Sequence, residues 1–329
     1  MSILVAGGAG YIGAHVVHLL LERGEKVIVV DDLSYGSASR IGDSKLLKLD
    51  IADMSSIEPL VNVMLEDNVQ SVIHFAARKQ VGESVEKPAW YYQQNVGGMA
   101  NLLLAMEKAS VKEMIFSSSA AVYGAPPVSV VKEDINKKPI NPYGASKLIG
   151  EEMLQACEKA WGLKWAALRY FNVAGAGSDQ LGDPAILNLI PMVLDRLAKG
   201  EQPKIFGNDY PTPDGTCVRD YIHITDLAVA HINAMEYLRK NEHFEFHSFN
   251  VGTGKGTSVK EIIDVIEKVS GMKLDPEILP RRKGDPPQLI GDVTRIGKVL
   301  GWKAKYGLEE MVQSAWNAWQ AGDRPIKVK

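Results

Sequence analysis

The hydrophobic positions in the first half of the chain alternate between short continuous runs and longer runs with helical spacing. The short runs, rich in β-branched residues, are predicted to be strands at residues 3–6, 26–30, 45–49, 71–76, 113–118 and 164–171. Amphipathic segments predicted to be helices lie between them, at 12–23, 55–67, 90–109 and 143–161. Near-continuous apolar strands that alternate with helices are typical of a parallel sheet covered on both faces. The pattern therefore predicts an α/β fold with a doubly wound parallel sheet.

The second half of the chain has a different texture. From about residue 175 onward proline, glycine and aspartate become frequent, and the predicted strands and helices become short. Such a loop-rich segment is predicted to be a smaller C-terminal α/β domain that contributes ligand contacts. The run at 247–252 has the pattern of another buried strand, so the chain is expected to return to the main sheet near 222–252. The predicted domains are therefore 1–175 and 176–329, with an approximate boundary.

Composition argues against several classes of protein. Apolar residues make up 46% of the 329 residues, charged residues make up 23%, and the net charge is -3. These values give no reason to expect a nucleic-acid or anionic-membrane partner. The two cysteines lack disulfide-framework or metal-ligand spacing, and no histidine spacing indicates a metal site. Since neither a targeting signal nor a membrane-spanning run is recognised, we expect a cytoplasmic protein without metal.

The segment LVAGGAGYIG is the strongest local motif. Gly8, Gly10 and Gly13 satisfy G-x-G-x-x-G, and Gly7 takes the place of Gly8 in the longer G-x-x-G-x-x-G variant. Glycine permits a tight turn and lets the backbone approach a pyrophosphate, which the N-terminus of the next helix also attracts. An ordinary strand-to-helix turn is the alternative, but Asp31 ends the next predicted strand, where it can bind an adenosine ribose. The two features predict a Rossmann-type site for NAD rather than NADP, because a carboxylate there would repel a 2′-phosphate.

Residues suited to acid–base chemistry follow the fifth predicted strand. The serines of FSSSAAVYG (116–124) end that strand at the carboxyl edge of the sheet, where open α/β sheets bind ligands. Tyr143 and Lys147 follow in NPYGASK, four apart and so on one helical face, although Asn141 and Pro142 equally suit a plain helix start. A lysine cation, together with a positive nicotinamide, favours the phenolate of a tyrosine, whose pKa is otherwise near 10. The phenolate can then take a proton from an alcohol as hydride leaves for NAD.

Together with the glycine motif, this set resembles the short-chain dehydrogenase/reductase superfamily in its longer sugar-nucleotide form. Seven ordered segments, spread over nearly the whole chain, sharpen the resemblance to the UDP-glucose 4-epimerase (UDP-galactose 4-epimerase) family: GGAGYIG, HFAARKQVGESVEKP, FSSSAAVYG, NPYGASK, LRYFNVAGA, IFGNDYPTPDGTCVRDYIH and PRRKGD. The resemblance implies a UDP-hexose substrate whose C4 is inverted by hydride transfer to tightly bound NAD, rotation of the 4-ketose and return of the hydride. It also implies an NAD-binding first domain, a UDP-sugar-binding second domain, and a homodimer formed by the helices near 90–109 and 143–161.

The resemblance further implies roles for individual residues. Tyr143 would be the base, Lys147 its pKa-lowering and ribose-binding partner, and Ser119 the hydroxyl that orients the substrate O4. The implied cofactor contacts are Gly7, Gly10, Tyr11, Ile12, Gly13, Asp31, Asp32, Asp50, Ile51, Phe75, Ala76, Ala77, Lys79, Asn95, Ser117, Tyr143, Lys147 and Phe171. The implied UDP-sugar contacts are Ser119, Tyr143, Asn172, Asn188, Leu189, Lys204, Ile205, Phe206, Arg219, Arg282, Asp285 and Leu289.

Several of these residues have structural alternatives. Arg219 and Arg282 suit bidentate contacts with a diphosphate, but they would equally suit a solvated surface. Asn172 would also cap a turn, and Asn95 would also hold helix backbone. These alternatives stay open on the sequence.

Other activities on the same fold are disfavoured by particular residues. Sugar-nucleotide dehydratases and decarboxylases of this superfamily need acid–base side chains where this chain has Ala120 and Ala121, whose methyl groups transfer no proton. A non-catalytic NAD(H)-binding protein would be expected to lack the Ser/Tyr/Lys set. Within the family, the residue four positions after the R-x-G-D aspartate limits the size of the sugar. Leu289 at that position predicts additional activity on UDP-GlcNAc and UDP-GalNAc.

Overall fold

The computed structural model describes residues 1–282, 285–322 and 326. The chain divides into two compact units. Unit 1 comprises residues 1–124, 135–169 and 228–249, and unit 2 comprises 125–134, 170–227 and 250–329. Each unit therefore combines stretches that are far apart in the sequence.

Unit 1 is built on a seven-stranded sheet whose strand order is β11-β7-β5-β4-β1-β2-β3. The pairs β1–β2, β1–β4, β2–β3 and β4–β5 are all parallel. This arrangement confirms the predicted doubly wound α/β sheet and the return of the chain as an edge strand near 247–252. The chain runs outward from β1 in both directions, which leaves the topological switch point of the sheet beside β1. The strands are β1 (Ser2–Ala6), β2 (Lys26–Asp31), β3 (Lys45–Lys48), β4 (Val69–His74), β5 (Glu113–Ser119), β7 (Lys164–Tyr170) and β11 (Ser248–Val251).

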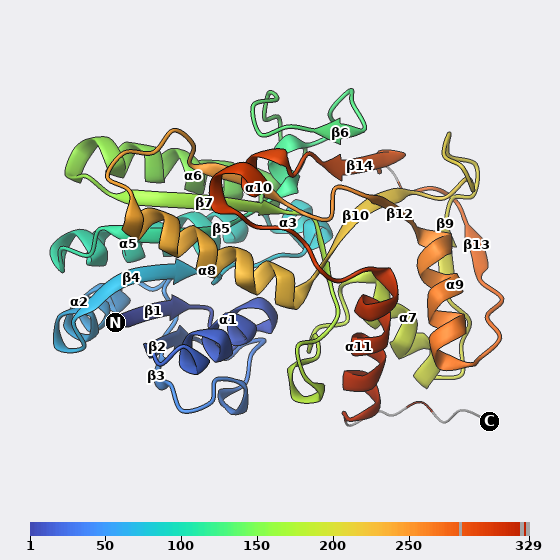
Figure 1. Cartoon of the computed structure of the whole chain (residues 1–329), viewed down its shortest axis with the longest axis horizontal. Coiled ribbons are helices and arrows are strands. Elements are labelled where there is room, and N and C mark those ends of the chain that lie inside the picture. The colour runs from blue at the N-terminus through green and yellow to red at the C-terminus, as the bar shows by residue number, and fades with distance from the viewer. Residues whose placement is uncertain (283–284, 323–325, 327–329) are drawn as a thin grey trace. The chain divides into compact units, whose positions relative to one another are not determined.

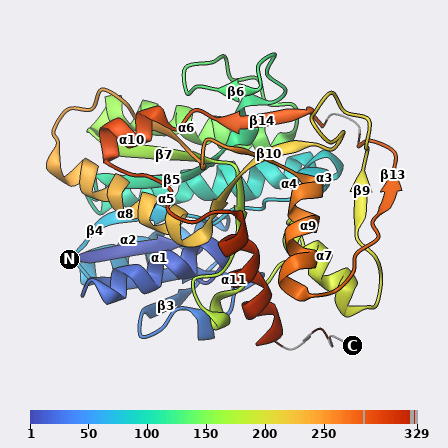
Figure 2. The same ribbon diagram turned by 45° about the vertical axis from the view of Figure 1, so that its right-hand side comes forward.

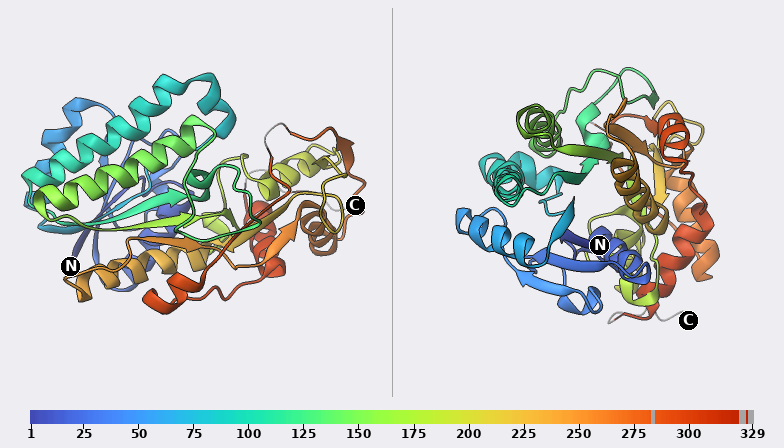
Figure 3. Two further views of the ribbon diagram at one scale, coloured as in Figure 1. Left: turned by 90° about the horizontal axis from the view of Figure 1, so that it is seen from above. Right: turned by 60° about the vertical axis from the view of Figure 1, so that its left-hand side comes forward.

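Helices cover both faces of this sheet. Helices α5 (Gly98–Lys108) and α6 (Pro142–Trp161) lie side by side on one face, while α1 (Tyr11–Glu22) and α8 (Ile224–Lys240) lie on the other (Figures 1 and 3). Helix α2 (Ile57–Glu66) packs against α5. The shorter helices of unit 1 are η1 (Ala38–Arg40), η2 (Met54–Ser56), α3 (Val81–Glu86), α4 (Pro88–Tyr92), η3 (Gln93–Gly97) and η4 (Ala120–Tyr123).

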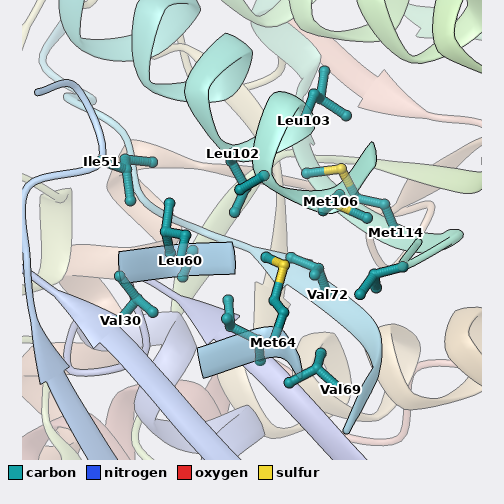
Figure 4. Packing of buried hydrophobic residues seen from close by; sticks show 14 of the residues in the cluster. Val30, Ile51, Leu60, Met64, Val69, Val72, Leu102, Leu103, Met106 and Met114 are labelled. Carbon is teal, nitrogen blue, oxygen red and sulfur yellow. The ribbon is translucent and has the colours of Figure 1, made fainter. Parts of the chain in front are cut away.

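The main core of unit 1 fills the space between the sheet and α2, α5 and α6. Figure 4 shows Leu60 and Met64 of α2 facing Val72 of β4, with Leu102 and Met106 of α5 beside them. Each of these side chains is at most 1% exposed. Burying one side chain of this size stabilises the fold by about 1.5–3 kcal/mol, so the alternation of apolar strands and amphipathic helices is what specifies this unit.

The helix predicted over 90–109 contains a π-helical segment that the sequence pattern does not reveal. Gln93–Gly97 (η3) form this segment between α4 and α5. Inside it, the Asn95 side chain donates to the Arg78 carbonyl oxygen at 3.0 Å and to the Ser146 hydroxyl at 3.0 Å. π-helical turns occur frequently at functional sites, and this one supplies Gln94 to the groove described below.

Unit 2 combines small sheets with three packed helices. Its larger sheet has the order β12-β10-β14-β6, with β8 also pairing with β10, and β9 pairs with β13 alongside (Figure 2). Helices α7, α9 and α11 enclose the core of this unit, which includes Ile190, Ile262 and Trp316. The elements are β6 (Val130–Val131), β8 (Asn172–Ala174), η5 (Asp179–Leu181), α7 (Leu189–Ala198), β9 (Lys204–Phe206), β10 (Val218–His223), β12 (Gly256–Ser258), α9 (Val259–Ser270), β13 (Glu277–Leu279), β14 (Gln288–Gly291), α10 (Thr294–Leu300) and α11 (Leu308–Gln320).

Neither a membrane-spanning helix nor a metal-binding cluster is found in the described part of the chain. None of the helices in residues 1–282 and 285–322 has the length and apolarity needed to cross a bilayer. In the same part of the chain, no three His, Cys, Asp or Glu side chains are grouped so that they could hold a metal ion.

Candidate active site

The β1–α1 turn brings backbone close to backbone, as the glycine motif requires. Gly7 has a φ of 79°, and a Cβ on it would lie 2.5 Å from the Ala76 nitrogen. A Cβ on Gly13 would lie 2.2 Å from the Gly7 carbonyl oxygen. Gly10 is the N-cap of α1 and has no side chain that could accept a hydrogen bond from the helix. The first N–H groups of α1 are therefore available to an anion. The turn is therefore suited to a pyrophosphate.

An open groove of about 640 Å³ lies beside this turn, where β1 to β4 end. Of the predicted cofactor residues, it brings together Gly7, Gly10, Asp31, Asp32, Asp50, Ile51, Phe75, Ala76 and Ala77. It also contains Val30, Ser34, Tyr35, Gly36, Leu49, Arg78 and Gln94, which the sequence did not single out. A groove at the switch point of the sheet, next to a glycine turn at a helix N-terminus, fits a dinucleotide.

Asp31 is held at the adenosine side of the groove by two backbone donors. The Ala9 N–H donates to its Oδ2 at 2.9 Å and the Leu33 N–H donates to its Oδ1 at 2.8 Å. Burial raises the pKa of Asp31, and these two hydrogen bonds partly offset the rise. The oxygens keep lone pairs that can accept from ribose hydroxyls, whereas a 2′-phosphate would meet a carboxylate. The geometry therefore suits NAD better than NADP.

Other predicted cofactor residues lie outside the lining of the groove. Tyr11, Ile12 and Gly13 form the first turn of α1, and Lys79 is exposed. Asn95 has the structural role that the sequence left open, because it also accepts a hydrogen bond from the Arg78 N–H at 2.8 Å. Phe171 belongs to unit 2, where a Cβ on Gly291 would lie 2.5 Å from its ring. Cofactor contacts of these residues stay predictions.

Ser119, Tyr143 and Lys147 come together as a buried set at the carboxyl end of β5. Each is at most 8% exposed. The Ser119 hydroxyl hydrogen-bonds to Tyr143, and the Lys147 ammonium donates to the Ser117 carbonyl oxygen at 2.8 Å. Helix α6 carries both Tyr143 and Lys147. Asn141 and Pro142 also have the helix-start role that the sequence suggested. The Asn141 side chain accepts a hydrogen bond from the Gly144 N–H at 2.8 Å, and Pro142 is the first residue of the helix.

The predicted lowering of the Tyr143 pKa relies on the nicotinamide as well as on Lys147, and the protein's own groups do not provide it. Burial raises the pKa of Tyr143, and only the hydrogen bond from Ser119 acts in the opposite direction. Burial also lowers the pKa of Lys147 to about 7, which weakens the positive charge that the argument relied on. Both shifts have one cause, because a low-dielectric site disfavours every charged form. A phenolate at Tyr143 therefore requires additional positive charge, as the nicotinamide would supply.

A second layer of buried polar residues lies behind this set, and the sequence analysis missed it. The Arg169 guanidinium donates to both carboxylate oxygens of Glu151, from Nε at 2.8 Å and from Nη2 at 2.5 Å. The Ser118 hydroxyl donates to Glu151 at 2.6 Å, and Arg169 also donates to the Tyr123 hydroxyl at 3.1 Å. Glu151 stands one helical turn beyond Lys147 on α6, so this layer joins the catalytic helix to β5 and β7.

The opposite face of β5 is anchored by histidine. The Ser117 hydroxyl lies 3.0 Å from His231 Nε2 of α8, whereas Ser118 points to α6, as the alternation along a strand requires. His74 of β4 is 1% exposed, and burial together with the Lys147 charge lowers its pKa to about 3. With this lowered pKa the His74 imidazole is neutral near pH 7, so His74 adds no charge to the site.

The predicted UDP-sugar residues lie in unit 2, apart from Ser119 and Tyr143. Arg219 and Leu289 are partners in the parallel pairing of β10 and β14, and the guanidinium of Arg219 lies 3.5 Å from Asp285. Arg282 stacks over the Phe206 ring at 3.9 Å from its centroid. Five more of them lie in other elements of this unit: Asn172 in β8, Asn188 as the N-cap of α7, Leu189 in α7, and Lys204 and Ile205 in β9. Their contacts with substrate stay predictions.

One conspicuous residue of the VRDYIH segment has a structural role. Asp220 is fully buried and accepts from the Thr253 N–H at 2.8 Å, the Gly254 N–H at 3.1 Å and the Gly291 N–H at 3.2 Å. It thereby ties the loop after β11 and the end of β14 to β10. Asp220 orders the strands that present Arg219 and Leu289.

The fold and site define a class of protein: a Rossmann-type, dinucleotide-dependent enzyme that contains a buried Ser–Tyr–Lys set. The chain belongs to the NAD dependent epimerase/dehydratase family, which residues 3–252 match. Its cofactor is accordingly NAD.

Three similar proteins are all named as 4-epimerases of UDP-sugars. A UDP-glucose 4-epimerase from Halalkalibacterium halodurans is 46% identical over 325 residues, covering 96% of this chain and 95% of that protein. The crystal structure of UDP-glucose 4-epimerase from Bifidobacterium longum in complex with NAD+ and UDP superposes with a TM-score of 0.88 at 39% identity, covering 97% of this chain and 98% of that one. The UDP-Glc/GlcNAc 4-epimerase from Campylobacter jejuni superposes with a TM-score of 0.83 at 41% identity, covering 96% and 98%.

Proposed function

We propose that this chain is a UDP-glucose 4-epimerase, which interconverts UDP-glucose and UDP-galactose with bound NAD. The observation that carries this proposal is the buried Ser119–Tyr143–Lys147 set at the end of β5, in the same unit as a groove suited to NAD. The similarity to UDP-glucose 4-epimerases over nearly the full chain supports the choice of substrate.

The residues of the chain would move the proton and orient the alcohol. When bound, NAD would supply a reversible acceptor for the C4 hydride of the hexose. Tyr143 takes the proton of the C4 hydroxyl and later gives it back, so the protein is unchanged after each turnover. The Ser119 hydroxyl, already bonded to Tyr143, orients the same oxygen. Lys147, anchored on the Ser117 carbonyl, favours the Tyr143 phenolate whenever it is protonated.

The turn after β5 argues against a dehydratase or decarboxylase. Ala120 and Ala121 begin η4 directly after Ser119, and neither has a group that transfers a proton. Elimination of water from C5 and C6 needs an acid and a base beside those carbons. The described turn offers only methyl groups there, which favours epimerisation alone.

The test is conversion of UDP-galactose by NAD-loaded protein, followed through the anomeric proton signals of the two sugars by NMR. We expect an equilibrium mixture of UDP-galactose and UDP-glucose, with no net reduction of NAD. Tyr143→Phe should lower turnover at least 100-fold, since general-base catalysis contributes about 10²–10⁴-fold. Net formation of NADH with an oxidised sugar, or near-normal turnover by the Tyr143→Phe variant, would refute the proposal.

We also propose that unit 1 binds NAD and that unit 2 binds the UDP moiety. Arg219 and Arg282 are the two guanidinium groups suited to the diphosphate. Arg282 is already held against Phe206, and Arg219 lies near Asp285, so the two can reach a bound phosphate with little loss of side-chain freedom. Arg219→Met should raise the Kd for UDP measured by calorimetry at least tenfold, whereas an unchanged Kd would remove Arg219 from the site.

Action on N-acetylated sugars is a second candidate activity, and it depends on Leu289. This side chain is partly buried on β14 beside Arg219 and is smaller than the tyrosine that excludes such sugars in the resembling family. We expect turnover of UDP-GlcNAc in the same NMR assay, and we expect Leu289→Tyr to abolish it while keeping UDP-galactose turnover. Absence of UDP-GlcNAc turnover by the unaltered chain would refute this candidate without affecting the first.

A homodimer through the 90–109 and 143–161 segments is the quaternary structure we propose. Leu104 of α5 is 46% exposed and Tyr92 of α4 is 37% exposed, so both are large side chains available to a partner. Sedimentation equilibrium should give twice the 36.0 kDa mass of the chain, and Leu104→Asp should give the monomer. A monomeric parent protein would exclude this arrangement.

A further inference from the structure

The Arg78 side chain connects two segments that line the NAD groove. Its Nη2 donates to Asp32 Oδ2 at 3.0 Å and its Nη1 donates to Ser34 Oγ at 2.7 Å, both in the loop after β2. Its Nε donates to Gln94 Oε1 at 3.1 Å, in the π-helical segment. All four residues belong to unit 1 and line the same groove. The guanidinium therefore joins the two sides with all three of its nitrogens engaged.

The strand order explains why this connection crosses the groove. Arg78 follows β4, whereas Asp32 and Ser34 follow β2, and β1 lies between these strands in the sheet. Neighbouring strands are about 4.8 Å apart, so a bridge from one to the other spans about 10 Å across the end of β1. The glycine turn that holds a pyrophosphate begins where β1 ends, at Gly7. A bridge between the ends of β4 and β2 therefore crosses the end of β1, next to the turn suited to a pyrophosphate.

The bridge is held firmly at both ends. The Arg78 backbone is fixed to Asn95 by a hydrogen bond in each direction, at 2.8 and 3.0 Å. The guanidinium lies between two aromatic rings, 5.5 Å from the Tyr35 centroid and 5.3 Å from the Trp90 centroid. Burial acts to raise the pKa of Asp32, but the hydrogen bonds from Ser34 and the Arg78 charge outweigh it and lower the pKa. Asp32 is thus an anion paired with a cation that is only 15% exposed.

We propose that Arg78 is a strap that closes over bound NAD and sets the rate at which the cofactor enters and leaves. The side chain spans the groove, so NAD can pass only when the contacts to Asp32 and Ser34 open. The strap is therefore expected to slow both association and dissociation. Removing the Arg78 side chain should increase both rate constants. Their ratio, the Kd for NAD, should change by a smaller factor than either rate constant.

The test measures NAD release without using the epimerase activity. Protein loaded with NAD is diluted into alcohol dehydrogenase and ethanol, which reduce each released NAD to NADH that is read at 340 nm. Association is read as quenching of protein fluorescence in a stopped-flow instrument. We expect Arg78→Met to raise both rate constants at least tenfold. Ser34→Ala removes one anchor and should raise them by a smaller factor, and it should have no further effect in the Arg78→Met background.

Two controls separate the strap from a general loss of structure. Arg23→Met removes an exposed ion pair with Glu236 in the same unit and should leave both rates unchanged. Arg78→Lys keeps the positive charge but lacks the three nitrogens of the guanidinium, so it should release NAD faster than the parent protein. Its far-UV circular dichroism spectrum should be the same as that of the parent protein. Unchanged rates in Arg78→Met, or faster dissociation with unchanged association, would overturn the strap, since the second result describes a simple contact with NAD.

Discussion

Replacing Arg169 by methionine tests whether the buried ion pair behind the active site holds unit 1 together. Methionine has a similar length but no donors, so Arg169→Met leaves the Glu151 carboxylate with the Ser118 hydroxyl as its one remaining donor among the contacts described above. The side chains of Arg169 and Glu151 are only 3% and 6% exposed, so water cannot replace the lost guanidinium without rearrangement. Although burial opposes the charge, Glu151 keeps the pKa of Arg169 above its usual range, so the guanidinium is charged.

The magnitude follows from what is left unpaired. The hydrogen bonds of Arg169 include two to Glu151, one to Tyr123 and one to Ser248. Removing one partner of a buried ion pair costs about 3–5 kcal/mol, because the other charge stays in a low-dielectric site. Typical domains are stable by about 5–15 kcal/mol, so the substitution should remove a large share of the stability of unit 1. The free energy of the pair relative to two apolar residues is a separate quantity and is expected to be small.

Equilibrium urea unfolding, followed by far-UV circular dichroism, measures both quantities. We expect Arg169→Met to lower the free energy of unfolding by about 3–5 kcal/mol. The double variant Glu151→Leu/Arg169→Met should recover most of that loss, because it leaves no buried charge. The exposed pair of Arg23 and Glu236 provides a control, for which Arg23→Met should cost at most about 1 kcal/mol. A loss below about 1 kcal/mol for Arg169→Met, or no recovery in the double variant, would refute the reasoning.

Three further outcomes are expected. Gly13→Ala should abolish measurable NAD binding in calorimetry, because its Cβ would lie 2.2 Å from the Gly7 carbonyl oxygen, while Gly82→Ala, with open space around it, should bind NAD normally. Asn141→Ala should lower the free energy of unfolding by about 1 kcal/mol through loss of the α6 N-cap, and an unchanged value would contradict that role. The pKa of Lys147 is about 7 in the folded protein and 10.5 otherwise, so the unfolded chain binds more protons between these values. Unfolding free energy should therefore rise from pH 7 to 10 relative to a Lys147→Met variant, by at most about 4 kcal/mol, and parallel pH profiles would contradict it.

Local patterns were enough to predict the fold and the residues that form the glycine turn. The run Ile3–Ala6 followed by Gly7, Gly10 and Gly13 specifies a buried strand, a tight turn and a helix start within a few residues of one another. The sequence also placed Tyr143 and Lys147 on one face of a helix, because only the helical period is needed for that inference. Such predictions succeed because every interacting group is close along the chain.

The contacts that join distant strands could not be predicted in the same way. Arg78 meets Asp32 across 46 positions, and Arg169 meets Tyr123 across 46 positions as well. Which strands become neighbours decides both contacts, and the apolar pattern of a strand does not specify its neighbour. Glu151 was the one recognisable signal, since it lies four residues beyond Lys147 and an acidic residue on the buried face of a helix needs a partner. Its partner, Arg169, became visible only with the sheet order.

The electrostatics of Tyr143 and Lys147 depend on burial as much as on their proximity. In an isolated pair, the Lys147 ammonium stabilises the Tyr143 phenolate, and the sequence argument combined that attraction with the positive charge of the nicotinamide. In the structure burial disfavours both ions, so the Tyr143 pKa rises and the Lys147 pKa falls to about 7. Tyr143 therefore stays protonated in the protein alone, and a positive charge brought by the cofactor shifts the balance toward the base. The same burial that withholds the base from the empty protein makes its activation depend on cofactor binding.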